Sequence, residues 1–392
     1  MRGDSKMINH IRTVFKDKFM VKPNKVYFAP GRVNIIGGHT DYNGGNVLPF
    51  CIDKGLFAAV SNTDDLKIRI FSENFNLEGI IAVDLTATKY EKKERYSDYL
   101  LGIIKELQVL NLHLDHGLNI SLSSNLPVGG GLSSSAALCM LLLEIINDEF
   151  DFGLERLERV KLAKKVENDF IGVNCGIMDQ FVIGYGKKDK AVFLNAKTLS
   201  FEYIDLLLDD YSFILINSQL NRTLKGSKYN DRQKETNEAL KILQKTFKLD
   251  YLCDLELTDL DKALTLLGDN ILRKRVKHVI TESDRVVKAK HALNNHDYES
   301  LGKLLTEAHY SAKDDYEISA PTLDKMVDLA LENKALGAKM IGGGFGGSIL
   351  VLVSDDEIDD FIENYQKSFV KEFGKKFIYN IVSAGTGVKL ID

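Results

Sequence analysis

The sequence has few cysteines, no excess of positive charge and no apolar run long enough to cross a membrane. Its four cysteines are widely spaced along 392 residues and form no C-x-x-C pair, which favours a reducing compartment over a disulfide framework. Lysines and arginines number 51 against 56 aspartates and glutamates, and the formal net charge of −5 gives no general attraction for nucleic acid or anionic lipid. The most apolar run, residues 136–146, is too short to span a bilayer, and the opening residues lack the apolar core of a signal peptide. We therefore expect a cytoplasmic protein without a nucleic-acid or membrane partner.

The length predicts two domains. At roughly 150 residues per domain, the chain is long enough for one domain over residues 8–200 and a second over residues 201–392. Strand-like and helix-like segments are mixed, without the strict alternation that is typical of a doubly wound parallel sheet. The predicted fold class is therefore α+β.

Three local patterns give expectations that a structure can test. An apolar run at residues 26–29 predicts a strand that ends at the Pro30-Gly31 pair. Residues 55–73 predict a hairpin, because hydrophobic residues alternate with charged ones after a polar turn. The basic run "LRKRVK" at residues 272–277 is expected to form a solvated helix face.

The strongest local signal is the segment "LPVGGGLSSSAA" at residues 126–137. The glycines Gly129–Gly131 allow the backbone to approach a ligand closely. The serines Ser133–Ser135 precede an almost wholly apolar helix and are expected to cap it, so the segment is typical of an anion site at a helix N-terminus. The alternative is an ordinary capped helix that follows a glycine turn.

Two common nucleotide motifs are excluded. No Lys-Ser or Lys-Thr follows the first glycines at the spacing of a P-loop. The segment "GGGFGG" at residues 342–347 formally matches G-x-G-x-x-G, but the strand-like "SILVLV" follows it where a dinucleotide fold needs a helix.

Taken together, the motifs resemble those of a family of small-molecule kinases. The segment at 126–137 resembles the phosphate loop shared by galactokinase, homoserine kinase, mevalonate kinase and phosphomevalonate kinase, and "KMIGGGFGGS" (339–348) resembles the third glycine motif of that superfamily. "APGRVNIIGGHTDYNGG" (29–45) is similar to the signature of galactokinases, and "ENDFIGVNCGIMDQF" (167–181) and "GSKYNDR" (226–232) match the same family. The resemblance implies a two-domain kinase fold with the active site in the cleft between the domains.

The resemblance also implies a reaction and its catalytic groups. The γ-phosphoryl group of ATP would pass to the anomeric hydroxyl of galactose, a reaction that needs positioning and charge neutralisation more than covalent help. Asp179 matches the aspartate that accepts the sugar proton, and Arg32 matches the arginine that faces it and the transferring phosphate. Ser135 and Glu167 match the positions that hold Mg²⁺ against the nucleotide phosphates, as two hard oxygen ligands suit magnesium. Each of three residues also has an ordinary alternative. Asp179 could be a turn aspartate, Arg32 could form a surface ion pair, and Glu167 could be an exposed glutamate on a helix.

The remaining implied contacts are with ATP and the sugar. ATP would lie against the phosphate loop, and adenine near Tyr96; the loop residues are Gly129, Gly130, Gly131, Leu132, Ser133, Ser134 and Ser135. Asp41 would hold the 3- and 4-hydroxyls of the sugar, with further contacts from His39, Gly176 and Tyr229. His39 and Tyr229 could instead serve only to pack the core.

Gly38 departs from the family pattern. Galactokinases usually have a glutamate there, against the 6-hydroxyl of the sugar, and losing a charged hydrogen bond costs about 1.5–3 kcal/mol. Two alternatives to galactose phosphorylation therefore stay open. The chain could phosphorylate another galacto-configured sugar that is altered at C6, such as a uronic acid, a 6-deoxy sugar or arabinose, or it could be a sensor that binds sugar and ATP without turnover.

Overall fold

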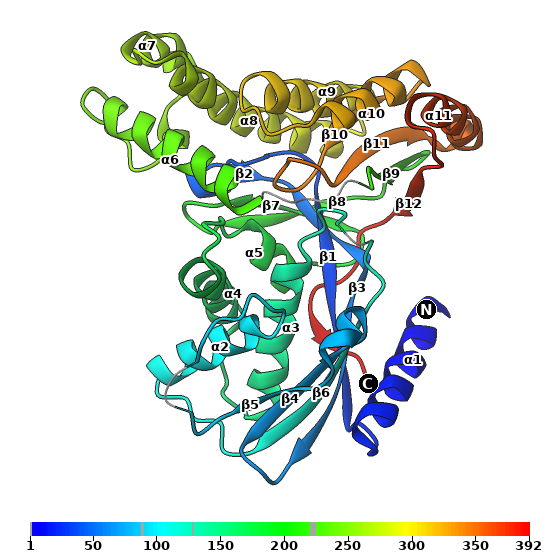
Figure 1. Cartoon of the computed structure of the whole chain (residues 1–392). Coiled ribbons are helices and arrows are strands. Elements are labelled where there is room, and N and C mark those ends of the chain that lie inside the picture. Colours follow the sequence, from blue (N-terminus) through cyan, green and yellow to red (C-terminus); the bar gives the residue numbers. More distant parts are fainter. Residues whose placement is uncertain (1, 88–89, 128, 220–224) are drawn as a thin grey trace.

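A computed structural model of the chain describes residues 2–87, 90–127, 129–219 and 225–392 (Figure 1). The lower half of the view contains a six-stranded sheet in the order β13-β1-β3-β6-β4-β5. Its strands are β1 (Lys25–Asn34), β3 (Pro49–Thr63), β4 (Lys67–Ser72), β5 (Ile81–Asp84), β6 (Gly117–Ser124) and β13 (Lys389–Leu390). Neighbouring strands are antiparallel except for β4 and β6, which are parallel.

This sheet corrects two of the local predictions. The predicted hairpin at 55–73 is wrong, because β6 lies between β3 and β4 and pairs with both. Alternation marks the strands but does not say which of them pair. The strand predicted for 26–29 does not end at Pro30-Gly31 either: β1 continues to Asn34, with a shift of register between Pro30 and Arg32. Such irregularities often redirect a side chain next to an active site.

Helices cover both faces of the six-stranded sheet (Figure 1). Helix α1 (Arg2–Phe19) packs on one face, where it contacts β3 and β6. On the other face lie α2 (Asp98–Val109), α3 (Ser134–Glu149), α4 (Arg156–Lys165) and α5 (Met178–Tyr185). Alternate residues of β1 serve the two cores, as the two-residue period of a strand requires: Val26 and Phe28 join the core beneath α1, and Tyr27 and Ala29 join the main core.

A second layer occupies the upper part of Figure 1. Its antiparallel sheet has the order β10-β11-β9-β12, with β9 (Tyr211–Asn217), β10 (Gly337–Met340), β11 (Ser348–Ser354) and β12 (Ile378–Val382). Its helices are α6 (Lys225–Leu243), α7 (Leu260–Leu266), α8 (Asn270–Asn294), α9 (Tyr298–Asp314), α10 (Pro321–Glu332) and α11 (Ile358–Phe373). Both faces of β9 are buried: Phe213 and Leu215 join the main core, and Ile214 and Ile216 join a separate core of the upper layer.

The two layers are connected more than once along the chain. A small sheet of β2 (Asn46–Val47), β7 (Lys190–Asn195) and β8 (Phe201–Asp205) lies between them. The boundary near residue 200 stays a prediction; it falls between β7 and β8, which pair with each other, and β13 near the C-terminus returns to pair with β1. The mixture of mainly antiparallel sheets and packed helices confirms the α+β class.

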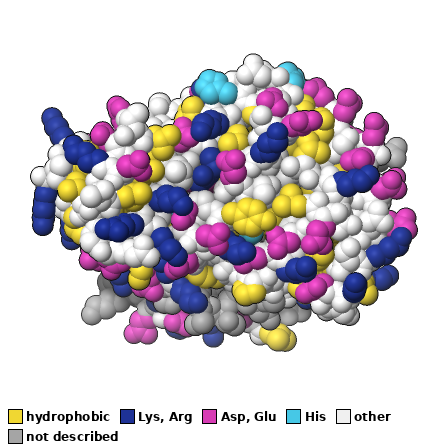
Figure 2. Space-filling view, turned by 90° about the horizontal axis from the view of Figure 1, so that it is seen from above, with side chains coloured by type: hydrophobic (Ala, Val, Ile, Leu, Met, Phe, Trp, Pro, Cys, Tyr) yellow, Lys and Arg dark blue, Asp and Glu magenta, His cyan; other side chains and the backbone are white. Residues whose placement is uncertain are grey.

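Charged side chains of both signs are interspersed over the upper face of the molecule (Figure 2). The basic run 272–277 lies on α8. Besides the apolar Leu272 and Val276, one of its basic residues is buried, so the prediction of a solvated face is wrong there. Arg275 is 1% exposed, and its guanidinium donates to Glu235 at 2.6 Å and to Glu317 at 2.8 Å. Within the described residues, no helix is both long and apolar enough to cross a membrane.

Candidate active site

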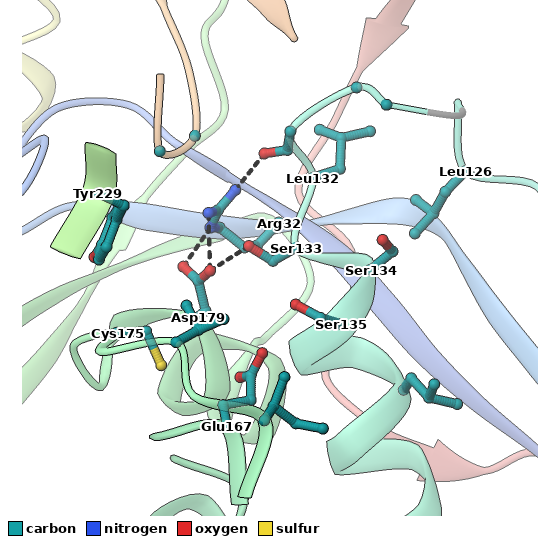
Figure 3. A pocket seen from close by; sticks show the side chains of 18 of the residues that line it. Arg32, Leu126, Leu132, Ser133, Ser134, Ser135, Glu167, Cys175, Asp179 and Tyr229 are labelled. Atoms are coloured by element: carbon teal, nitrogen blue, oxygen red, sulfur yellow. Dashed lines mark hydrogen bonds and ion pairs between the residues drawn. The ribbon is translucent and has the colours of Figure 1, made fainter. Parts of the chain in front are cut away.

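A single cavity of about 830 Å³ brings together every residue that the sequence placed in the site. Its walls come from β1 and the loop after it, the glycine-serine loop, α5, α8 and the glycine loop between β10 and β11. Figure 3 shows the part of the cavity where the glycine-serine loop faces α5. Residues more than 200 positions apart in the sequence therefore share one chamber.

Arg32 and Asp179 form the centre of this chamber (Figure 3). Arg32 lies on β1 just after the register shift, and Asp179 lies in the first turn of α5. The guanidinium donates through Nε to Oδ1 at 2.7 Å and through Nη2 to Oδ2 at 2.9 Å. Arg32 is 4% exposed, whereas the Asp179 side chain is 26% exposed. A buried, paired cation thus fixes a carboxylate that stays open to the cavity.

The glycine-serine loop is held against the same arginine. The backbone N–H of Arg32 donates to the carbonyl of Leu132 at 3.1 Å, and its Nη1 donates to the carbonyl of Gly131 at 2.8 Å. Gly129 and Gly131 adopt left-handed conformations, with φ of +68° and +77°. Both the glycines and the arginine are therefore needed to shape the loop.

The prediction that the serines cap the following helix is wrong for Ser133. This residue occupies the N-cap position of α3, but it has a φ of +55° and its side chain makes no capping hydrogen bond. Its hydroxyl donates instead to Oδ2 of Asp179. The serine therefore helps to hold the central carboxylate, and the first amides of α3 keep the anion-binding character of a helix N-terminus.

Glu167 and Ser135 face each other below this centre (Figure 3). Glu167 lies in a π-helical turn, residues Val166–Ile171, that follows α4; such turns are frequent at functional sites. Its carboxylate is 4% exposed and accepts a hydrogen bond from Gln180. Burial raises the pKa of Glu167 to about 7, and the hydrogen bonds from Gln180 and Ser135 only partly oppose this rise.

The donor set fits a cation that also binds phosphate. Among the described residues, no group of three or more His, Cys, Asp or Glu side chains could hold a metal by itself. A carboxylate and a hydroxyl beside an anion-binding loop are suited to Mg²⁺, which takes few protein ligands and completes its shell with phosphate oxygens and water. Gln180 was missed by the sequence reasoning, although it directly follows Asp179 in the "GIMDQ" motif.

One end of the cavity, beside Asp179, is built around Asp41 and Gly176. Asp41 begins a short 3-10 helix (Asp41–Asn43), and its Oδ2 accepts from the backbone N–H of Met178 at 3.3 Å. Burial, together with the nearby Asp179, raises the pKa of Asp41. A Cβ atom at Gly176 would lie only 1.8 Å from Oδ2 of Asp41. Gly176 is therefore a glycine because the aspartate occupies its side-chain space.

Aromatic side chains surround His39 at the same end. Its Nδ1 lies 2.8 Å from the hydroxyl of Tyr42, which lies 2.7 Å from that of Tyr316. Tyr229 on α6 packs at 4.8 Å between ring centroids, and the glycine loop touches it from behind, because a Cβ at Gly343 would lie 3.3 Å from the Tyr229 ring. Burial lowers the pKa of His39 to about 3, so the imidazole is neutral at physiological pH.

Gly38 lies between these groups and α8. Its φ is outside the left-handed region, and the atom nearest to an added Cβ would be Oε1 of Glu282, at 3.9 Å. The position could therefore accept a side chain. Three further residues line the cavity here and were missed by the sequence reasoning: His278, Glu282 and Lys339. No local motif marked the two residues of α8, while Lys339 opens the segment "KMIGGGFGGS".

Tyr96 lies at the outer part of the cavity. Its ring stacks on Phe75 with 5.4 Å between centroids, and its hydroxyl donates to the carbonyl of Ile70 at 3.3 Å. One face of the ring is therefore already covered. Adenine stacking near Tyr96 stays a prediction.

Comparisons with known proteins find three family models along the chain. Residues 13–62 match the galactokinase galactose-binding signature, residues 98–187 match the GHMP kinases N terminal domain, and residues 289–371 match the GHMP kinases C terminal family. The chain is 38% identical to a galactokinase of Bacillus subtilis over 98% of this chain and 99% of that protein. It is 41% identical to a galactokinase of Enterococcus faecalis over 89% and 90% of the two chains.

Solved structures show the same likeness. The galactokinase of Lactococcus lactis, complexed with galactose, superposes with a TM-score of 0.94 at 35% identity and covers 98% of this chain and 100% of its own. The mevalonate kinase of Methanococcus jannaschii shares the fold, with a TM-score of 0.65 at 21% identity over 92% and 98% of the chains.

Proposed function

This chain belongs to the galactokinase family, and we propose that it transfers the γ-phosphoryl group of ATP to the anomeric hydroxyl of galactose, giving galactose 1-phosphate and ADP. Its membership makes it an ATP-dependent sugar kinase of the GHMP fold, as the motifs predicted. The observation that carries the proposal is the Arg32–Asp179 pair, which lies in one cavity with both the glycine-serine loop and Asp41.

The proposed roles follow from how each group is held. Asp179 would accept the proton of the attacking hydroxyl, since its carboxylate is fixed by Arg32 and Ser133 yet remains accessible from the cavity. Arg32 would stabilise negative charge on the transferring phosphoryl group, because it is a buried cation held in place by Asp179 and the Gly131 carbonyl. The loop amides and the N-terminus of α3 would bind the other phosphates.

Mg²⁺ would be held by Glu167 and Ser135. When bound, it neutralises charge on the nucleotide phosphates. The raised pKa of Glu167 supports this assignment, because a carboxylate without a cation beside it is poorly stabilised in so buried a position. We further expect a cytoplasmic location, where ATP is available and where the four free cysteines would stay reduced.

At the sugar end, Asp41 would bind the hydroxyls that distinguish galactose from glucose, with His39, Gly176 and Tyr229 around it. The space at Gly38 also favours tolerance at C6, because its nearest neighbour would be 3.9 Å from an added Cβ. We therefore expect galactose analogues altered at C6 to be accepted as secondary substrates.

The test is ADP release from ATP and Mg²⁺ with a panel of sugars: galactose, glucose, 6-deoxygalactose, arabinose and galacturonate. Galactose should give turnover, with a 1-phosphate product by ³¹P NMR, and glucose should not. Asp179→Ala is the matched variant and should abolish detectable turnover while ATP binding persists. A rate within tenfold of the parent, or about 1.4 kcal/mol of barrier, would show that Asp179 does not have the assigned role.

A further inference from the structure

The loop of residues 35–40, which carries His39 to the sugar end of the cavity, has an unfavourable backbone. Gly37 and His39 both adopt left-handed conformations, with φ of +98° and +63°. In a residue that has a side chain, such as His39, this conformation is disfavoured. Asn34 and Thr40 donate to the Gly37 carbonyl from within this part of the chain, and two further contacts come from a distant helix.

The first contact comes from Glu282 on α8. The backbone N–H groups of Gly37 and Gly38 both donate to its Oε1, at 2.9 and 3.0 Å. Two successive amides that converge on one anion form a nest, which is filled here by a side chain from the upper layer. Glu282 is 1% exposed, and its Oε2 accepts from Nε of Arg285 at 2.8 Å. Burial alone would raise the pKa of Glu282, but Arg285, His278, Lys339 and the Gly38 amide lower it to about 2.

The second contact comes from His278, one turn earlier on the same helix. Its Nε2 lies 3.0 Å from the carbonyl oxygen of Gly38, and its Nδ1 lies 2.9 Å from the hydroxyl of Ser311. A carbonyl can only accept, so Nε2 carries the proton and Nδ1 accepts from Ser311. Both polar groups of the Gly38 backbone are therefore bound by α8.

We propose that Glu282 is a positioning residue for sugar binding: through the amides of Gly37 and Gly38, and with His278, it sets the place of His39 and Asp41. Glu282 needs no contact with the sugar for this role. Without the carboxylate, the nest is empty and His39 can relax out of its left-handed conformation. Sugar affinity then falls, while the ATP side of the cavity, which is built on β1 and α3, is unchanged. The sugar itself is the one named in the proposed function, on which this inference rests.

The test removes the carboxylate without stranding its partner. Loss of Glu282 alone would leave Arg285, whose side chain is 11% exposed, without the carboxylate that it pairs with, and such a loss can unfold a protein. Replacement of both by apolar residues of similar size is often tolerated. The variant is therefore Glu282→Met with Arg285→Met. The control is Glu106→Met with Lys165→Met, a pair at 2.7 Å in which Glu106 is 6% exposed, Lys165 is half-exposed and also pairs with Asp169, and both lie outside the cavity lining.

Two measurements decide the proposal. In the Glu282 variant, the amides of Gly37 and Gly38 should exchange with deuterium at least tenfold faster, and the calorimetric Kd for galactose should rise five- to fiftyfold, with the KM for ATP within twofold of the parent. The control pair should change neither. Unchanged exchange would overturn the proposal, and so would faster exchange with a galactose Kd within twofold of the parent. If the unmutated protein released no ADP with galactose and ATP, the proposed function would be refuted instead. The exchange rates would still show whether Glu282 holds the loop of residues 35–40.

Discussion

Gly176→Ala should impair sugar use by displacing the side chain of Asp41. The new methyl carbon would lie 1.8 Å from Oδ2 and 2.1 Å from Cγ of Asp41. Gly176 is outside the left-handed region, so an alanine adds no backbone strain there. Asp41 must give way instead, by more than 1 Å, because real Cβ atoms essentially never lie within 3.0 Å of a neighbouring atom. Misplacing a positioning group by this amount costs about 10²-fold in rate, or about 2.7 kcal/mol.

The assay is steady-state kinetics with galactose and ATP varied in turn. We expect kcat/KM for galactose to fall about a hundredfold, with the KM for ATP changed far less, because the clash involves the side chain assigned to the sugar. Gly38→Ala is the control within the site, since its nearest atom would be 3.9 Å away, and Gly268→Ala is the control outside it, with nothing within 4 Å. If Gly176→Ala kept a kcat/KM within threefold of these controls, the placing of Asp41 against the sugar would be refuted.

Three further predictions address the metal, the sugar and pH. Glu167→Gln should raise the Mg²⁺ concentration for half-maximal rate, because a neutral amide binds a hard dication poorly. An unchanged magnesium dependence would show that Glu167 is not a magnesium ligand and has only a structural role. Gly38→Glu should raise the preference for galactose over 6-deoxygalactose by roughly ten- to a hundredfold. The measurement is the ratio of the two kcat/KM values. An unchanged ratio in a stable variant would mean that another group already binds the substituent at C6 of the sugar. Burial lowers the pKa of His278 to about 4, so the folded state binds fewer protons than the unfolded state between about pH 4 and 6.5, and its stability falls as the pH drops through that window. Urea unfolding should therefore show that, from pH 6.5 down to pH 4, the parent protein loses about 3 kcal/mol more of its free energy of unfolding than His278→Gln does. Equal losses in the two proteins would contradict the lowered pKa of His278.

The chemistry of the site could be predicted from the sequence because each motif is local. The glycine-serine loop and the buried helix after it could be recognised from residues 126–149 alone, since glycine conformations and helix starts depend on neighbours in the chain. The same holds for the galactokinase signature, and the predicted residues do share one cavity. The order of strand-like and helix-like segments likewise predicted the α+β class without any knowledge of strand pairing.

What the tertiary structure decided is how these local pieces meet. The insertion of β6 between β3 and β4 depends on pairing between distant segments, which alternation cannot encode. The hydroxyl of Ser133 donates to Asp179 and not to the backbone of α3, because the fold brings this carboxylate of α5 within hydrogen-bonding distance. Glu282 and His278 had no motif to mark them, and their importance comes from two backbone amides and a carbonyl that lie 240 or more positions earlier in the chain. Residue types specify which groups can react, whereas contacts between remote segments fix where those groups are held.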